Sequence, residues 1–80
     1  MIKEISSNLP NLENLFLMGN KIGEFREIEE LKNCKNLKRV ILTNNPIIYK
    51  NHYRLYVINL IKGLVLLDFV KVAKHERITA

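Results

Sequence analysis

The hydrophobic positions of this chain repeat with a spacing of 25 residues. Apolar and amide residues recur at matching offsets, with no insertion or deletion between the two copies. The matched pairs are Asn11 and Asn36, Leu12 and Leu37, Leu15 and Val40, Leu17 and Leu42, Asn20 and Asn45, and Ile22 and Ile47. In each copy a short stretch with apolar residues at every second position precedes the amide, which predicts a strand. Internal periods of roughly 20–50 residues are typical of proteins that stack one small structural unit.

The repeated pattern, L-x-x-L-x-L-x-x-N-x-I, is that of the leucine-rich repeat. It predicts an α/β solenoid with a short parallel sheet on the concave face, a helical or irregular convex side and a helical cap at the C-terminal end. Because strand side chains alternate, the core should receive Leu15, Leu17, Val40 and Leu42. After each strand the backbone leaves the sheet, and a short amide side chain can pair with the polar groups exposed there. We therefore predict a stacked structural column of Asn20 and Asn45.

The chain divides into leucine-rich repeats over residues 1–48 and a C-terminal cap over 49–80. Residues 1–10 resemble the tail of an earlier repeat, so we expect the chain to be the C-terminal portion of a longer repeat protein. A solenoid without an N-terminal cap exposes a strand edge. The uncapped edge is therefore expected to promote self-association.

Within the cap, apolar spacing predicts a helix over 49–63 that Gly63 ends. A degenerate third strand is expected over 64–70 and a short closing helix over 71–80. In the return segment before the cap, the spacing of Phe25, Ile28 and Leu31 suggests a helical turn on the convex side, with the surrounding glutamates in solvent.

Composition indicates a single small domain, and we expect no enzyme because no serine or cysteine nucleophile has a plausible base. The 80 residues are 48% hydrophobic, without an apolar run near 20 residues or a signal-peptide pattern, so we expect no membrane contact. The single cysteine, Cys34, has the spacing of a buried hydrophobic residue in a reducing compartment. His52 and His75 lack neighbours at metal-ligand spacing, and there is no glycine-rich phosphate loop, so we expect no cofactor or metal.

Charge is distributed unevenly along the chain. Residues 1–31 carry three basic and six acidic side chains, a net charge of −3, whereas residues 32–80 carry ten basic and two acidic, a net of +8. The positive charges are scattered and are not interleaved with stacking aromatics. Direct contact with nucleic acid is therefore a weaker expectation than contact with a protein.

Residues that point away from the core should line the concave face in columns, because neighbouring strands lie about 4.8 Å apart. Phe16, Ile41 and Asp68 would form one column, and Met18, Thr43 and Val70 another. The predicted partner-binding residues are Asn14, Phe16, Met18, Lys38, Arg39, Ile41, Thr43, Asp68, Val70 and Lys71. Such an apolar strip with a basic rim suits an amphipathic partner helix, although segments of a longer chain could also cover it. In the cap, Tyr53 should pack and Arg54 should pair with a carboxylate such as Asp68 or with strand-end carbonyls.

The second half of the chain, residues 36–80, closely resembles the U2 small nuclear ribonucleoprotein A-prime family. The resemblance is carried by ILTNNPI at 41–47, KNHYRLYVI at 50–58, LDF at 67–69, KV at 71–72 and ER at 76–77. At 60–63 the chain departs from the family, which has a proline-containing turn there.

This resemblance implies a non-catalytic nuclear scaffold of the spliceosome. Family members bind an RNA-recognition-motif protein of the B-double-prime type and support its binding to U2 small nuclear RNA. The alternative is a regulatory interaction module without RNA, of the phosphatase-, chromatin- or dynein-associated kind. The HYRLYVI string at 52–58 favours the first interpretation.

Overall fold

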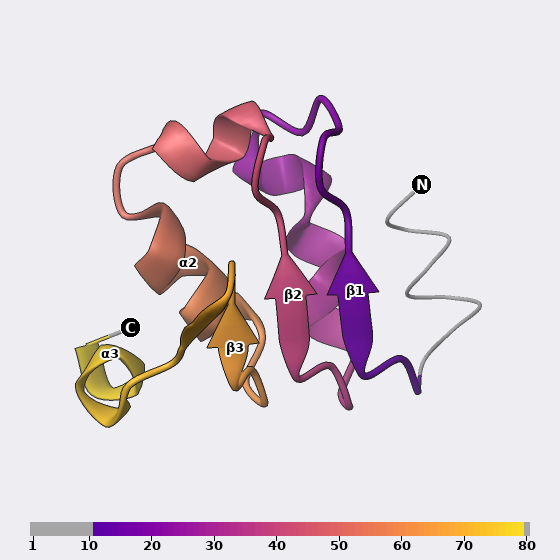
Figure 1. Ribbon diagram of the computed structural model, residues 1–80. Helices are drawn as coiled ribbons and strands as arrows, with labels where there is room; N and C mark the ends of the chain where they lie inside the picture. The colour runs from indigo at the N-terminus through magenta and orange to yellow at the C-terminus, as the bar shows by residue number, and fades with distance from the viewer. Residues whose placement is uncertain (1–10, 80) are drawn as a thin grey trace.

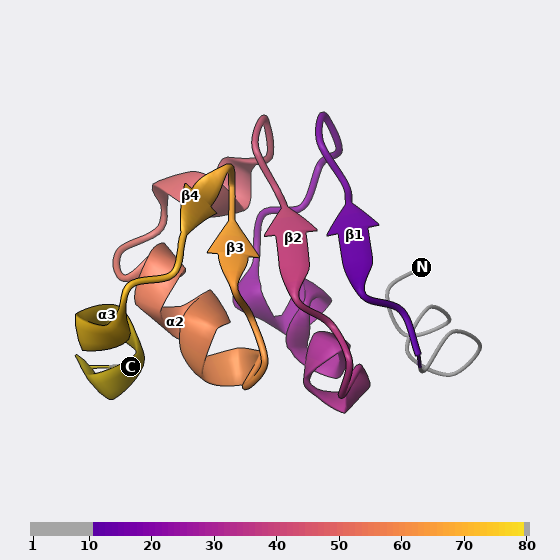
Figure 2. The same ribbon diagram turned by 60° about the horizontal axis from the view of Figure 1, so that its bottom comes forward.

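The computed structural model describes residues 11–79, which form a mostly parallel sheet backed by short helices. The strands are β1 (Asn14–Phe16), β2 (Arg39–Ile41), β3 (Leu66–Leu67) and β4 (Val70–Lys71). The helical segments are the 3-10 helices η1 (Phe25–Glu27), η2 (Glu29–Asn33) and η3 (Pro46–Tyr49), and the α-helices α2 (Tyr53–Leu60) and α3 (Lys74–Thr79). Figures 1 and 2 show the strands side by side, the helical segments behind them, and α2 and α3 at the C-terminal end.

The two repeats lie abreast in the register that the sequence predicts. β1 pairs with β2 in parallel, with Leu15 opposite Val40 and Phe16 opposite Ile41. β2 pairs in parallel with β3, where Arg39 lies opposite Leu66. A shift of one residue would turn every core side chain to the other face, so this register fixes which residues are available on the open face. The leucine-rich-repeat fold is confirmed.

The core lies between the sheet and the return segments. Val40 and Leu42 are fully buried, Leu15 is 7% exposed, and Leu17 is only half-buried but packs against the same core. The return segment contributes Ile28 and the buried residues that follow it at every third position. It is helical, as expected, but as the two 3-10 helices η1 and η2.

The asparagine column is present, but its two members differ. Asn45 is 1% exposed; its Nδ2 donates to the carbonyls of Leu17 (2.9 Å) and Leu42 (2.9 Å), and its Oδ1 accepts from the amide of Ile22 (3.2 Å). Asn45 therefore joins the two repeats through their turns. Asn20 is exposed, and its Nδ2 bonds only within its own turn, to the carbonyls of Leu17 and Met18.

The cap differs from the expected pattern in its boundaries. The predicted helix over 49–63 is divided into η3 and α2, which are separated by three residues that include His52 in a left-handed conformation. α2 ends three residues before Gly63, and the closing helix α3 is shorter than 71–80. η3 crosses the expected boundary between residues 48 and 49, so the division into repeats and cap stays a prediction.

The expected third strand over 64–70 is instead a tight hairpin. β3 contains only Leu66–Leu67; the chain then turns at Asp68 and Phe69, and β4 returns antiparallel to β3 (Figure 2). β4 occupies the outer edge of the sheet. The expected uncapped edge beside β1 involves residues 1–10, which lie outside the part of the chain that the structure describes. Between residues 11 and 79, no helix has the length and apolarity to span a bilayer.

Candidate partner-binding face

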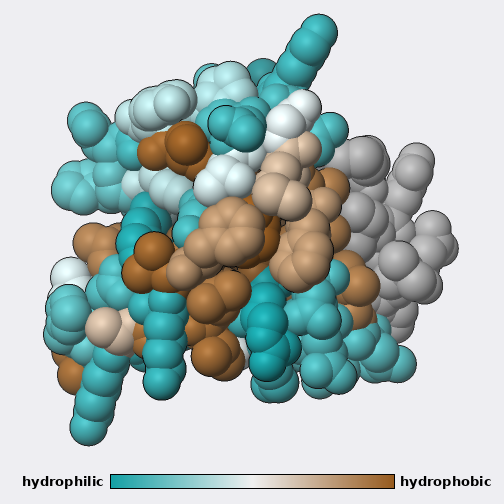
Figure 3. All heavy atoms as spheres, viewed as in Figure 1, coloured by the Kyte–Doolittle hydropathy of each residue, from teal (hydrophilic) through white to brown (hydrophobic). Residues whose placement is uncertain are grey.

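The sheet face turned away from the return segments is the concave face, and it carries exposed apolar side chains. Phe16 is 57% exposed and Met18 is 48% exposed, whereas their neighbours Leu15 and Leu17 face the core. Figure 3 views this face and shows apolar residues gathered over the strands, with hydrophilic residues around them. Large apolar side chains that remain in water over a contiguous area are typical of a binding surface.

Ile41 lies on this face but is not exposed, which corrects the expectation from its column. Its neighbours Val40 and Leu42 belong to the core cluster and Ile41 does not, as strand alternation requires, yet only 2% of it is accessible. Phe16 flanks it in register on β1, and the β3–β4 turn runs along its other side. Ile41 therefore forms the floor of the apolar area.

Asp68 and Val70 do not join the columns that the repeat pattern predicts. The Asp68 carboxylate accepts hydrogen bonds from the Leu42 amide (2.6 Å) and the Tyr53 hydroxyl (2.6 Å), so it is used within the fold. Val70 lies opposite Leu67 in the antiparallel pair, and opposite residues share a face. Because Leu67 is in the core, Val70 is directed to the core side at the sheet edge. The half-buried Thr43 consequently has no Val70 neighbour on the concave face.

A polar row runs beside the apolar area, toward the beginnings of the strands. Its polar members are Asn14, Arg39 and Lys71, and the apolar Leu66 lies in register between Arg39 and Lys71. An Arg39 guanidinium nitrogen donates to Asn14 Oδ1 (3.2 Å). Lys38 is exposed immediately before this row. The basic rim predicted from the sequence is therefore present at one end of the concave face, and it favours an acidic partner segment there.

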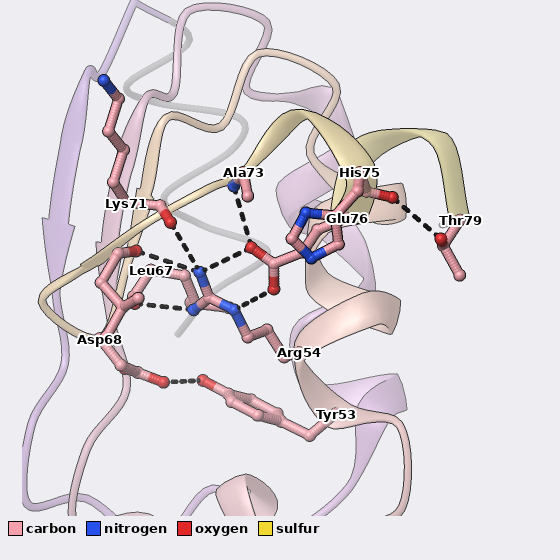
Figure 4. Close-up of polar contacts among 10 residues, drawn as sticks. Tyr53, Arg54, Leu67, Asp68, Lys71, Ala73, His75, Glu76 and Thr79 are labelled. Carbon is pink, nitrogen blue, oxygen red and sulfur yellow. Dashed lines mark hydrogen bonds and ion pairs between the residues drawn. The ribbon is translucent and has the colours of Figure 1, made fainter.

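The cap is fixed to the sheet by a polar cluster centred on Arg54 (Figure 4). Its guanidinium donates to both carboxylate oxygens of Glu76, with the Nε–Oε2 distance at 2.5 Å. It also donates to the carbonyls of Leu67 (3.1 Å), Val70 (3.2 Å) and Lys71 (3.1 Å). Both kinds of partner expected for Arg54, a carboxylate and strand-end carbonyls, are therefore present, but the carboxylate is that of Glu76 and not that of Asp68, which the sequence suggested as an example. Arg54 thus joins α2, the β3–β4 hairpin and α3.

Two pKa values reflect this packing. The hydrogen bond from Arg54 and a second from the Ala73 amide lower the pKa of Glu76 to about 2, so the ion pair persists at any ordinary pH. Tyr53 is buried as predicted; its burial, followed by its bond to Asp68, raises the pKa of its phenol well above the usual range. Both groups therefore hold one protonation state and serve the fold.

Sequence reasoning missed Arg77 and Phe69. Arg77 donates to the carbonyls of Ile58, Ile61 and Leu64, which belong to the end of α2 and the segment after it. A cation at carbonyls that lack helical partners is a common way to end a helix, but no local pattern revealed it. Phe69, which falls within the third strand expected over 64–70, lies in a turn instead and is 66% exposed.

The described residues contain no grouping of three or more potential metal ligands. Cys34 is buried as predicted, and burial raises the pKa of its thiol, which disfavours the reactive thiolate. The chemistry that this arrangement can perform is recognition by the apolar area and its basic rim.

Comparison with known proteins agrees with the architecture. The family model described as leucine-rich repeat matches residues 1–80. Proteins named U2 small nuclear ribonucleoprotein A' are similar over most of the chain: the Schizosaccharomyces pombe protein is 38% identical over 96% of it, and the Homo sapiens protein is 39% identical over 86%. A protein named as probable U2 small nuclear ribonucleoprotein A' from Caenorhabditis elegans is 40% identical over 92% of it. The chain spans only about a third of these relatives, 32%, 27% and 29% respectively.

Solved structures also agree with the leucine-rich-repeat architecture. The crystal structure of the Drosophila melanogaster SNF/U2A' complex contains a chain that matches 94% of this one with a TM-score of 0.88 and 32% identity; the match covers 43% of that chain. The leucine-rich-repeat domain of Chaetomium thermophilum Mex67 matches 96% of the chain with a TM-score of 0.81 at 23% identity, over 52% of its own length. The second likeness concerns the fold alone.

Proposed function

This chain belongs to the leucine-rich-repeat family, and from that premise we propose that it is a non-catalytic interaction scaffold of the U2 small nuclear ribonucleoprotein. Its concave face binds an RNA-recognition-motif protein of the B-double-prime type. Through that partner it supports binding to U2 small nuclear RNA in pre-mRNA splicing, and it acts in the nucleus. The similarity to U2 small nuclear ribonucleoprotein A' proteins and to the SNF/U2A' complex supports this assignment.

The observation that carries the proposal is the exposed apolar area of the concave face. Phe16 and Met18 remain about half exposed although the same strand buries Leu15. The area is bordered at one end by Arg39 and Lys71. An amphipathic helix with apolar residues on one side and an acidic residue near one end complements both features.

The proposed role in RNA binding is indirect. The basic side chains of the concave face lie in a single row at one end of it, and no stacking aromatic is interleaved with them in that row. A row of this kind can add a few phosphate contacts to RNA already held by a partner, but it lacks the stacking surface of a single-stranded RNA site. The scaffold therefore raises the affinity of its partner for RNA instead of reading a sequence itself.

Affinity capture from nuclear extract tests the proposal. The tagged chain should recover a protein with an RNA-recognition motif together with U2 small nuclear RNA, identified by mass spectrometry and RNA sequencing. Phe16→Glu should abolish both, because it places a charge in the apolar area, whereas Ile78→Glu on exposed α3 should not. Recovery of a partner without U2 small nuclear RNA, before and after crosslinking, would favour a regulatory module and contradict the proposal.

A further inference from the structure

The β3–β4 turn holds two consecutive non-glycine residues in the left-handed conformation. Asp68 has φ of 51° and Phe69 has φ of 68°. Two-residue hairpin turns with two positive φ angles normally contain asparagine, aspartate or glycine. Aspartate tolerates this conformation, but a phenylalanine side chain is disfavoured by contact between its Cβ and the backbone. Phe69 therefore occupies a strained position that glycine would fill without strain.

Contacts beneath the turn maintain this conformation. The Asp68 amide donates to the Val40 carbonyl (3.0 Å), and its carboxylate accepts from Leu42 and Tyr53. Arg54 binds the carbonyls on either side of the turn, at Leu67 and Val70. A strained residue persists where the surrounding structure determines its conformation, and such residues concentrate at functional sites.

In this strained conformation the Phe69 side chain is exposed to solvent and is not packed against the core. Its side chain is 66% exposed, more than that of Phe16. The bonds of Asp68 to Val40 and Leu42 bracket Ile41, so the turn runs alongside this buried residue and brings Phe69 to the edge of the apolar area. Phe16 lies on the opposite side of Ile41.

We propose that Phe69 is an anchor residue for the protein docked on the concave face, and that the strained turn exists to present it. This inference rests on the proposed function and extends it. Phe16 and Phe69 would contact the apolar side of an amphipathic partner helix from two sides, with Ile41 as the floor between them. Aromatic residues beside a well-packed floor are the usual energetic centres of protein interfaces.

The test separates binding from stability by replacing Phe69 with glycine. Drosophila SNF serves as the probe, and calorimetry measures its affinity for the full chain, while urea denaturation measures stability. Phe69→Gly should weaken binding by about 30-fold, as expected for loss of an aromatic anchor. Its unfolding midpoint should stay unchanged or rise, because glycine relieves the left-handed strain. Phe69→Asn, which also tolerates this conformation, should behave in the same way, and Ile78→Ser should alter neither quantity.

The outcomes distinguish this inference from the proposed function. Unchanged affinity in Phe69→Gly, with binding lost in Phe16→Glu, would overturn the role of Phe69 alone. A large loss of stability in both Phe69 variants would also overturn it, because it would show that Phe69 serves packing. Absence of SNF binding by the unmodified chain would overturn the proposed function and this inference together.

Discussion

Replacement of Asn45 by alanine tests how the repeats are joined. The alanine removes a fully enclosed amide that bonds to Leu17, Leu42, Thr43 and Ile22. Two of these groups keep another donor: the Leu17 carbonyl retains Asn20 (2.7 Å) and the Thr43 carbonyl retains the Gly19 amide (3.2 Å). The Ile22 amide and the Leu42 carbonyl lose the partner that the side chain provided.

Each buried polar group left without a partner costs about 1–3 kcal/mol, so two such groups predict a loss of about 3 kcal/mol once partial access of water is included. The stability of a domain of this size is roughly 4–12 kcal/mol, so Asn45→Ala should fold but melt roughly 15 °C lower. Urea and thermal unfolding followed by circular dichroism measure this change.

Asn20→Ala is the matched control, because Asn20 has the equivalent position in the first repeat but is exposed and bonds only within its own turn. Asn20→Ala should lower the free energy of unfolding by only about 0.5–1 kcal/mol. Equal losses for the two variants, or a loss below about 1 kcal/mol for Asn45→Ala, would refute the reasoning that buried amide bonds between repeats stabilise the fold.

The pKa of Glu76 is lowered in the folded state, so the Arg54–Glu76 pair contributes stability above the unfolded pKa of about 4.3 and loses it as pH falls toward 2. Glu76→Gln should therefore lower the free energy of unfolding by about 1–2 kcal/mol at pH 7. In urea titrations between pH 4.5 and 2, the free energy of unfolding of this variant should depend less on pH than that of the unmodified chain. Parallel pH profiles of the two proteins would contradict this. Gly19 has φ of 72°, and its counterpart in the second repeat, Asn44, has φ of 61°. In thermal melts, Gly19→Asn should leave the free energy of unfolding nearly unchanged, whereas Gly19→Val should lower it by about 1–2 kcal/mol. Equal losses of stability in the two variants would show that the turn does not need this conformation.

The repeat pattern predicted the sheet well because, in a strand, the apolar or polar character of each side chain indicates which face of the sheet it lies on. Leu15 opposite Val40 follows directly from the period of 25 and from alternation. The 3-10 form of the return could also have been inferred: Ile22, Ile28, Leu31 and Leu37 are spaced by multiples of three and are all buried. A 3-10 helix has 3.0 residues per turn, so this spacing favours it over an α-helix.

The hairpin could not be predicted from local sequence. Leu64, Leu67 and Phe69 continue the repeat pattern, and the turn contains neither asparagine nor glycine to indicate a reversal. Its conformation is determined by hydrogen bonds from Tyr53 and Arg54, which lie 13–17 residues before their partners in the chain. Alternation gave the direction of Ile41 correctly, but its burial depends on neighbouring strands and on this turn.

Binding at the concave face is tested most directly by the Met18 methyl group, which belongs to one of only two methionines in the chain. Met18 is 48% exposed next to Phe16, so its carbon-13-labelled methyl signal reports on the apolar area alone. On titration with SNF, this signal should shift or broaden in proportion to complex formation measured by calorimetry. Formation of the complex with an unchanged Met18 signal would contradict the account, because the partner would then be bound elsewhere.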